Sequence, residues 1–266
     1  MLKVTKFGGS SMADAGQYQK VRSILQADPA RKVVIVSAAG KRDKKDHKIT
    51  DLLYLSFAHS QYGVDSSRIF DLIVERHTQI RDELGVSIDV EAELTQLKHR
   101  LDEKTITQDE LVSRGEYFSA KLMAAYLGFQ FVDAADWIRF NLDGTVDREK
   151  SYALLKDLYD DGGIVIPGFY GTMPDGHIRT FSRGGSDITG ALAAAALDAD
   201  VYENWTDVSG ILMADPRIVD NPQAIPEVTY DELRELSCSG AQVLHEGTIF
   251  PVREKNIPVN IRNTNA

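Results

Sequence analysis

The sequence predicts an α/β protein with a three-layer α/β/α architecture around an open, mainly parallel sheet. Three observations predict this fold class. A strand pattern at residues 2–7 ends in a glycine pair and precedes a helical pattern. Residues 32–37 form a continuous, mostly β-branched run, which is typical of a strand buried on both faces. Strand and helix patterns then alternate, as expected for βαβ units with parallel strands.

The first half of the chain carries most of the predicted helices. Apolar residues recur at helical spacing over 14–26, and residues 50–128 are mostly helical in pattern. Within that region we expect helices over 65–84, 89–103 and 108–127. The polar stretch 41–48 is expected to be a loop. It could close over a site or be an ordinary solvated loop.

The second half alternates short strands with helices. Strands are expected at 129–133, 163–167, 201–205 and 257–262, with 178–181 as a hairpin arm. Helices are expected over 186–197, 230–237 and 241–255. The 266 residues are interpreted as one large domain with unequal lobes, about 1–162 and 163–266.

The composition excludes several classes of protein. The 40 acidic and 30 basic residues leave a formal net charge of -10, which argues against nucleic acid or an anionic membrane as the main partner. No apolar run approaches the ~20 residues of a membrane helix. No signal peptide precedes the first strand, so we expect a cytoplasmic protein. A single cysteine and six histidines without ligand spacing predict no internal disulfide and no dedicated metal site.

Residues 6–11, Lys-Phe-Gly-Gly-Ser-Ser, form the first candidate functional segment. The segment lacks the endings of a P-loop and of a dinucleotide fingerprint. It does place Lys6 at a strand end, followed by two glycines that let backbone N–H groups approach an anion. Such a loop suits a polyphosphate, although a glycine turn between a strand and a helix is also a common structural element.

A second glycine loop opens the alanine-rich helix at 186–197. Arg183 could grip a carboxylate with two hydrogen bonds. Ser186 could cap the helix or bind a ligand, and Asp187 could simply complement the helix dipole. Two such loops could face each other where the strand order reverses, which is where open α/β sheets bind ligands.

Two further segments complete the set. Residues 205–211, Trp-Thr-Asp-Val-Ser-Gly-Ile, leave a strand and could line a nucleotide, or form a plain loop. Gly115 lies within a helical pattern, where glycine costs about 1 kcal/mol relative to alanine and usually has a packing or ligand reason. Its neighbour Glu116 could accept a hydrogen bond from a substrate ammonium, or lie on a solvated helix face.

Taken together, these segments resemble the aspartokinases, a branch of the amino-acid kinase superfamily. The resemblance covers essentially the whole chain, and its motifs stand in the family's order. These are residues 6–11, Ser-Arg-Gly-Glu at 113–116, Ser-Arg-Gly-Gly-Ser-Asp at 182–187, residues 205–211, Gly-Ala-Gln-Val-Leu-His at 240–245 and Ile-Pro-Val-Asn-Ile at 257–261. The segments at 113–116 and 205–211 favour the aspartate branch over kinases that act on glutamate, acetylglutamate, carbamate or UMP.

The resemblance implies a role for each matching residue. Lys6 would neutralise charge on the phosphoryl group during its transfer, and Asp187 would help to order the phosphate end of the site. The residues implied to bind ATP are Lys6, Gly8, Gly9, Ser10, Ser37, Thr206, Asp207, Leu212, Arg217 and Gln242. Those implied to surround aspartate are Ser37, Thr50, Glu116, Phe169, Arg183 and Ser186, with Arg183 on a carboxylate and Glu116 on the ammonium.

The implied reaction transfers the γ-phosphoryl group of ATP to the β-carboxylate of L-aspartate, the first step of lysine, threonine and methionine synthesis. Mg²⁺ would be held mainly by the phosphates. Another carboxylate acceptor, or a non-catalytic ligand-binding fragment, are the alternatives. The family commonly dimerises and usually continues into paired ACT regulatory domains, which we expect to be absent here.

Two positions depart from the family pattern. Gln242 replaces a lysine that generally reaches the nucleotide, and Leu212 replaces a common tyrosine. The first change removes a positive charge, so the sequence predicts a lower affinity for ATP.

Overall fold

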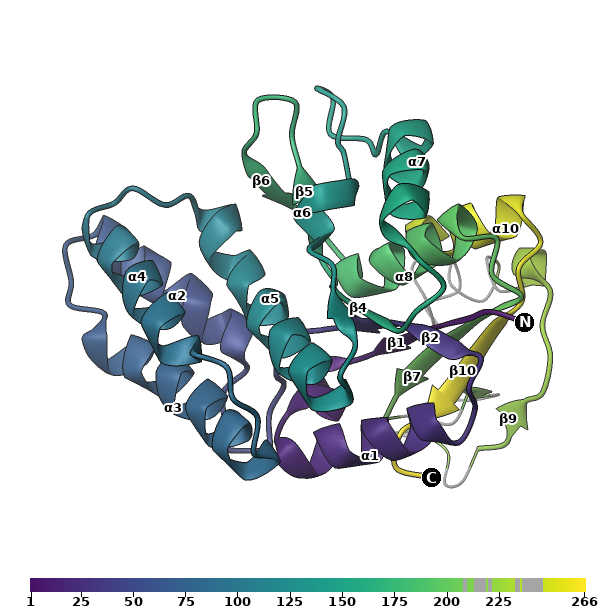
Figure 1. Cartoon of the computed structure of the whole chain (residues 1–266), viewed down its shortest axis with the longest axis horizontal. Coiled ribbons are helices and arrows are strands. Elements are labelled where there is room, and N and C mark those ends of the chain that lie inside the picture. Colours follow the sequence, from purple (N-terminus) through teal and green to yellow (C-terminus); the bar gives the residue numbers. More distant parts are fainter. Residues whose placement is uncertain (208–209, 213–218, 220–221, 233–234, 236–245) are drawn as a thin grey trace.

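A parallel sheet forms the centre of the molecule. The computed structural model describes residues 1–207, 210–212, 219, 222–232, 235 and 246–266. Its main sheet has six strands in the order β10-β7-β1-β2-β4-β3, and all five pairings are parallel (Figure 1). The strands are β1 (Lys3–Phe7), β2 (Arg31–Val36), β3 (Gln130–Phe131), β4 (Ile164–Pro167), β7 (Val201–Thr206) and β10 (Val259–Asn263). The predicted fold class is confirmed.

The strand order reverses at β1. The chain leaves β1 towards β2 on one side, and β7 later pairs with the other side of β1. Lys6 of β1 stands opposite Asn204 of β7, although the two residues are 198 positions apart. Open α/β sheets bind ligands outside the carboxyl ends of their strands at such a reversal. The topology therefore places the candidate site at the ends of β1 and β7.

Helices cover both faces of the sheet (Figure 1). The helix α1 (Ala15–Gln26) lies on one face, and the other face carries α7 (Arg148–Leu158), α8 (Gly185–Ala196) and α10 (Glu246–Glu254). Successive residues of β2 point into different cores on the two faces of the sheet. Val34 and Val36 pack in the core that includes α1, and Val33 and Ile35 pack in the core that includes α8. Burial on both faces accounts for the continuous β-branched run in the sequence.

A group of four helices extends beyond the sheet, at the left of Figure 1. They are α2 (Ile49–Gln61), α3 (Ser67–Leu84), α4 (Val90–Asp102) and α5 (Gln108–Leu127). The α5 helix begins after Thr107, whose hydroxyl accepts a hydrogen bond from the Glu110 N–H, and ends at Gly128 in the left-handed conformation. Contacts between α5 and β4 hold this helix against the sheet.

The remaining elements are short. They are the 3₁₀ helix η1 (Gly9–Met12), the helix α6 (Ala134–Trp137), the antiparallel hairpin β5 (Tyr170–Thr172) and β6 (Ile178–Thr180), and the antiparallel pair β8 (Ile211–Leu212) and β9 (Ala224–Ile225). The predicted helix at 108–127 and hairpin arm at 178–181 are confirmed. The predicted strand at 129–133 shortens to two residues, and α7 was not expected. Parts of the helices predicted over 230–237 and 241–255 lie outside the described residues.

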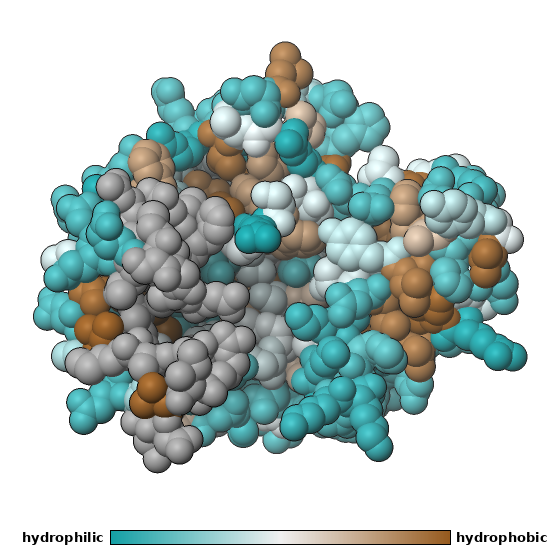
Figure 2. Space-filling model, turned by 180° about the vertical axis from the view of Figure 1, so that it is seen from behind, coloured by the Kyte–Doolittle hydropathy of each residue, from teal (hydrophilic) through white to brown (hydrophobic). Residues whose placement is uncertain are grey.

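The face of the molecule shown in Figure 2 is mainly polar, and its largest apolar patch lies over the end formed by α2 to α5. The exposed large apolar residues of the described chain include Tyr54 and Leu55 of α2 and Leu72 of α3. Within the described part of the chain, no helix combines the length and the apolar character needed to cross a membrane.

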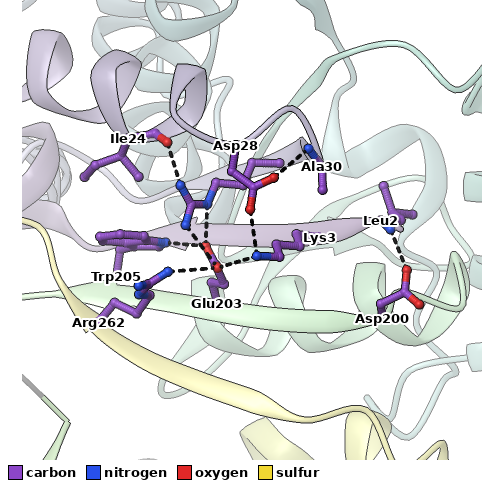
Figure 3. A network of polar contacts seen from close by, with 10 residues as sticks. Leu2, Lys3, Ile24, Asp28, Ala30, Asp200, Glu203, Trp205 and Arg262 are labelled. Atoms are coloured by element: carbon purple, nitrogen blue, oxygen red, sulfur yellow. Dashed lines mark hydrogen bonds and ion pairs between the residues drawn. The ribbon is translucent and has the colours of Figure 1, made fainter.

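One buried carboxylate joins four strands (Figure 3). Glu203 of β7 has a fully buried side chain that pairs with Arg31 at 2.8 Å, with Arg262 at 3.2 Å and with Lys3 at 3.5 Å. It also accepts a hydrogen bond from the indole of Trp205 at 3.0 Å. Burial alone would raise the pKa of this carboxyl, but its hydrogen bonds and cations outweigh burial and lower the pKa. The cluster therefore fixes β1, β2, β7 and β10 relative to one another, and Lys3 and Arg31 join it from the amino ends of their strands, away from the carboxyl ends that carry the site.

Candidate active site

Three polar side chains meet where the strand order reverses. The Lys6 ammonium lies 2.7 Å from Asp187 Oδ1, at the start of α8, and donates to Asn204 Oδ1 at 3.4 Å. The Asn204 amide donates to the same Asp187 oxygen at 3.0 Å. Lys6 and Asn204 are both buried, while the Asp187 side chain is 23% exposed. The structure thus brings together the two glycine loops that the sequence singled out.

The first glycine loop packs against the loop that follows β2. The Gly40 N–H donates to the Gly9 carbonyl at 2.8 Å, and a Cβ on Gly40 would lie 2.7 Å from the Gly9 backbone. The Gly8 N–H is taken by the Trp205 carbonyl at 3.1 Å. No acceptor for the N–H groups of Gly9 and Ser10 is found in the described part of the chain. These two groups are therefore available to an anion.

A buried arginine joins these loops to the polar stretch 41–48. Arg76 of α3 is 4% exposed and donates to the carbonyls of Gly40 at 3.0 Å and Ala13 at 3.2 Å. It also pairs with Asp46 at 2.5 Å. Burial would raise the pKa of the Asp46 carboxyl, but hydrogen bonds from Arg42 and the charge of Arg76 lower it well below its usual range. The stretch is thus a loop as predicted, and Asp46 ties it to the site.

Glu116 lies inside the protein rather than on a solvated helix face. The residue is 5% exposed, and its carboxylate accepts a hydrogen bond from the Ala38 backbone. Its Oε2 atom has no hydrogen-bond partner in the described structure. Burial raises the pKa of this carboxyl to about 8. A buried carboxylate with an unpartnered oxygen is suited to receive a cation from a ligand.

Gly115 allows α5 to pack closely against the loop that follows β2. A Cβ at Gly115 would lie 2.8 Å from the Ala38 side chain. Alanine there would push α5 away from the loop that follows β2. The glycine therefore has the packing reason that the sequence suggested, and it brings Glu116 next to Ala38, the residue that follows Ser37 in that loop.

The second glycine loop packs against a strained turn after β4. Phe169 has φ 85°, a left-handed conformation that is costly for a residue with a side chain. Two hydrogen bonds hold it, from its N–H to Thr189 Oγ1 at 3.1 Å and from the Phe181 N–H to its carbonyl at 2.8 Å. A Cβ on Gly185 would lie 2.6 Å from the Phe169 ring. Strain maintained in this way is common at ligand sites.

The other predicted substrate residues differ in how far they are exposed. Ser186 is buried, and a Cβ on Gly168 would touch its hydroxyl. Thr50 lies in the first turn of α2 and is partly buried. Arg183 is exposed and has no hydrogen bond or ion pair with any described residue. The binding of a substrate carboxylate by Arg183 stays a prediction.

The predicted nucleotide residues are described only in part. Thr206 ends β7, and its hydroxyl donates to the exposed Asp207 at 3.1 Å. The backbone of Leu212 lies in β8. Arg217 and Gln242 lie outside the described residues.

Sequence reasoning missed three side chains that build the site. Asn204 and Tyr202 of β7 both hold Asp187, the tyrosine by donating to the Asp187 carbonyl at 3.1 Å. A polar residue in a strand opposite Lys6 was the available signal for Asn204. Arg76 gave no signal, because it stands among the charged residues of α3 and becomes buried only through distant loops.

Replacing Gly8 should affect ligand binding and protein stability in different ways. Gly8 has φ -72° and ψ 170°, which alanine adopts freely, and a Cβ there would lie 3.6 Å from Lys6 Nζ. We expect Gly8→Ala to keep or raise stability, by about 0.4–1 kcal/mol. It should still weaken the predicted binding of ATP about tenfold or more, since overfilling a contact costs about 1–3 kcal/mol.

Thermal unfolding and calorimetric titration with ATP measure these two effects of Gly8→Ala. Gly40→Ala is the matched comparison, and it should lower the unfolding temperature because its Cβ meets backbone. Unchanged ATP affinity in Gly8→Ala would place the phosphates elsewhere.

Comparisons with known proteins agree with this geometry. Residues 1–263 match the model of the amino acid kinase family. The chain is 39% identical to aspartokinase 3 of Bacillus subtilis, over 99% of this chain and 61% of that protein. It resembles the crystal structure of Clostridium acetobutylicum aspartate kinase with a TM-score of 0.94 and 50% identity, covering 100% of this chain and 61% of the other.

A further solved structure is that of E. coli aspartokinase III in complex with aspartate and ADP, with a TM-score of 0.86 and 28% identity. The match covers 100% of this chain and 62% of that one. The chain thus spans about three fifths of the length of these proteins. A match to the family model over nearly every residue, together with the parallel sheet and its two glycine loops, shows that this chain belongs to the amino acid kinase family.

Proposed function

We propose that this chain is the catalytic domain of an aspartate kinase, which transfers the γ-phosphoryl group of ATP to the β-carboxylate of L-aspartate. The observation that carries the proposal is the contact between Lys6 and Asp187 at the strand reversal, because it joins two glycine loops around one cation. The products would be ADP and 4-phospho-L-aspartate. Relatives with this name, and a relative crystallised with aspartate and ADP, support the choice of substrates.

The chemistry asks for positioning and positive charge. A carboxylate nucleophile is already anionic, so its attack on a phosphoryl group needs no strong general base. Two negatively charged species must instead be brought together, and the charge that develops must be neutralised. Lys6 would supply the cation. The free N–H groups of Gly9 and Ser10 would supply backbone donors to the phosphates.

The acceptor would bind between α5 and the second glycine loop. Its ammonium would meet the unpartnered oxygen of Glu116, and a carboxylate would meet Arg183. Binding would convert a buried carboxyl of raised pKa into one side of an ion pair. Specificity for an α-amino acid would follow from this requirement, because an acceptor without the ammonium leaves Glu116 without its counter-ion.

The residues present fit a Mg²⁺ ion that is held mainly by phosphates. Among the described residues, no three His, Cys, Asp or Glu side chains gather as a metal site. Asp187 is a partly exposed carboxylate beside Lys6, with one oxygen outside the contacts to Lys6 and Asn204. When bound, the ion would neutralise phosphate charge and orient the γ-phosphoryl group.

An assay of ADP release over a panel of acceptors tests the proposal. The purified protein with Mg-ATP should turn over with L-aspartate and much more slowly with glutamate, N-acetylglutamate, carbamate or UMP. Turnover with another acceptor would reassign the enzyme within its family. Calorimetric binding of aspartate and ATP without any turnover would indicate a ligand-binding fragment.

Several finer points stay predictions. The division of labour between an N-terminal lobe for aspartate and a C-terminal lobe for ATP is part of the proposal, as is a homodimer. The cytoplasmic location also stays a prediction, because some of the matched relatives are chloroplastic.

A further inference from the structure

Asn204 occupies a position where the physics of a strand would favour an apolar residue. It lies within β7, 4% exposed, on the same face as Tyr202 in the core beneath α8. Asparagine is depleted in strands, and a buried amide costs free energy unless its groups are hydrogen-bonded. Both ends of this amide are used, one by Lys6 and one by Asp187.

The amide fits between these two charges in one orientation only. Its oxygen faces the Lys6 ammonium at 3.4 Å, and its nitrogen faces Asp187 Oδ1 at 3.0 Å. The reverse orientation would set N–H against a cation and an oxygen against an anion. Asn204 therefore links the cation of the first glycine loop to the carboxylate of the second without adding charge.

This arrangement leaves part of Lys6 for the substrate. An ammonium has three N–H donors, and its contacts with Asp187 and Asn204 occupy at most two of them. A Cβ on Gly8 would lie 3.6 Å from Nζ, so the ammonium stands directly over the glycine loop. A lysine held at two points directs its remaining donor, whereas one held by Asp187 alone can rotate about that single contact.

We propose that Asn204 is a positioning residue for phosphoryl transfer, one that holds Lys6 and Asp187 together so that the free donor of Lys6 faces the phosphates. The inference rests on the proposed function. Asn204 acts through Lys6 and touches neither substrate. Its loss should therefore lower kcat and leave the KM for aspartate nearly unchanged.

Two variants separate this role from a structural one. Asn204→Leu removes both hydrogen bonds, and we expect kcat to fall about tenfold or more, as displaced catalytic groups generally cause. Asn204→Asp keeps the shape but sets a second carboxylate beside Asp187. Paired carboxylates share a proton at low pH and repel when both ionise, so the loss of kcat should grow as pH rises.

The assay measures aspartate-dependent ADP release over pH 5.5–9, with Asn141→Asp as control because it adds the same charge at an exposed turn. The control should match the wild-type protein. If kcat in both Asn204 variants stays within about twofold of wild type, or falls without a change in the pH profile of Asn204→Asp, the inference is overturned.

A second measurement is independent of turnover. Nitrogen-15 NMR of the lysine ammonium groups, assigned with Lys6→Arg, reports how fast the Lys6 protons exchange with water in the ligand-free protein. Exchange should be faster in Asn204→Leu than in the wild-type protein or Asn141→Asp. Equal exchange rates would contradict the proposed contact. A wild-type protein that shows no aspartate-dependent turnover contradicts the proposed function instead, and the NMR result still decides the role of Asn204.

Discussion

Replacing Lys6 by methionine is expected to lower kcat for phosphoryl transfer to aspartate by about 10²–10³-fold, the usual effect of losing one contact to transition-state charge. The expectation follows from the place of the ammonium, buried over the glycine loop and held by Asp187 at 2.7 Å. Methionine keeps the length and apolar stem of the side chain and removes only its charge and donors. The KM for aspartate should change little, since the acceptor is expected to lie against Glu116.

Steady-state ADP release and thermal unfolding measure the effect of Lys6→Met together. Lys32→Met is the matched control: this lysine also lies on a strand, but at the amino end of β2, where it donates to the Asp161 carbonyl at 2.8 Å. The control should keep the wild-type kcat. If Lys6→Met keeps it as well while remaining folded, the phosphoryl group does not pass this lysine.

Replacing Glu116 by glutamine should raise the KM for aspartate more than the KM for ATP. A hydrogen bond to a charged group contributes about 1.5–3 kcal/mol, which corresponds to roughly a 10–100-fold change. The carboxyl has a pKa of about 8 in the ligand-free protein because it is buried, and only its ionised form pairs with an ammonium. In the wild-type protein, kcat/KM for aspartate should therefore rise with pH up to about 8, and Glu116→Gln should lack this rise.

The same shift makes a prediction about stability. The Glu116 pKa is about 8 when folded against an ordinary value of 4.5, so between these values the folded protein binds more protons than the unfolded one. This contribution to the free energy of unfolding is fully present below 4.5 and is lost as pH rises towards 8. Glu116→Gln should therefore stabilise the ligand-free protein more at pH 8 than at pH 5.

Urea unfolding at pH 5 and pH 8 tests this sign, with the exposed Glu149→Gln on α7 as control. Equal stabilisation of Glu116→Gln at both pH values would mean that the carboxyl titrates normally.

Lys6, Glu116 and Asp187 could be named as candidates from the sequence because each stands within two residues of a glycine whose role is local. A glycine at a strand end or within a helix marks a close approach, and the charged neighbour then becomes a candidate. The fold class could be predicted for a related reason, since the apolar run of β2 is continuous only when both faces are covered. These signals lie within a few residues of one another.

Arg76, Asn204 and α7 could not be predicted because their environment is assembled from distant parts of the chain. Arg76 is buried by the carbonyls of Ala13 and Gly40, and Asn204 is satisfied by Lys6, 198 residues away. The α7 helix buries only Ser151 and Leu155, so its apolar periodicity is weak. The α7 helix is instead held in place by packing against α8.

The central place of β1 has a consequence for synthesis of the chain. Its strand partner β7 follows almost 200 residues later, so at about 5–20 residues per second the ribosome needs roughly 10–40 s to supply it. During that interval one edge of the first strand has no partner, and unpaired edges invite association with other chains. Chaperone contact with the nascent N-terminal segment should therefore last until β7 emerges, and slowing translation between β2 and β7 should increase aggregation of the newly made protein.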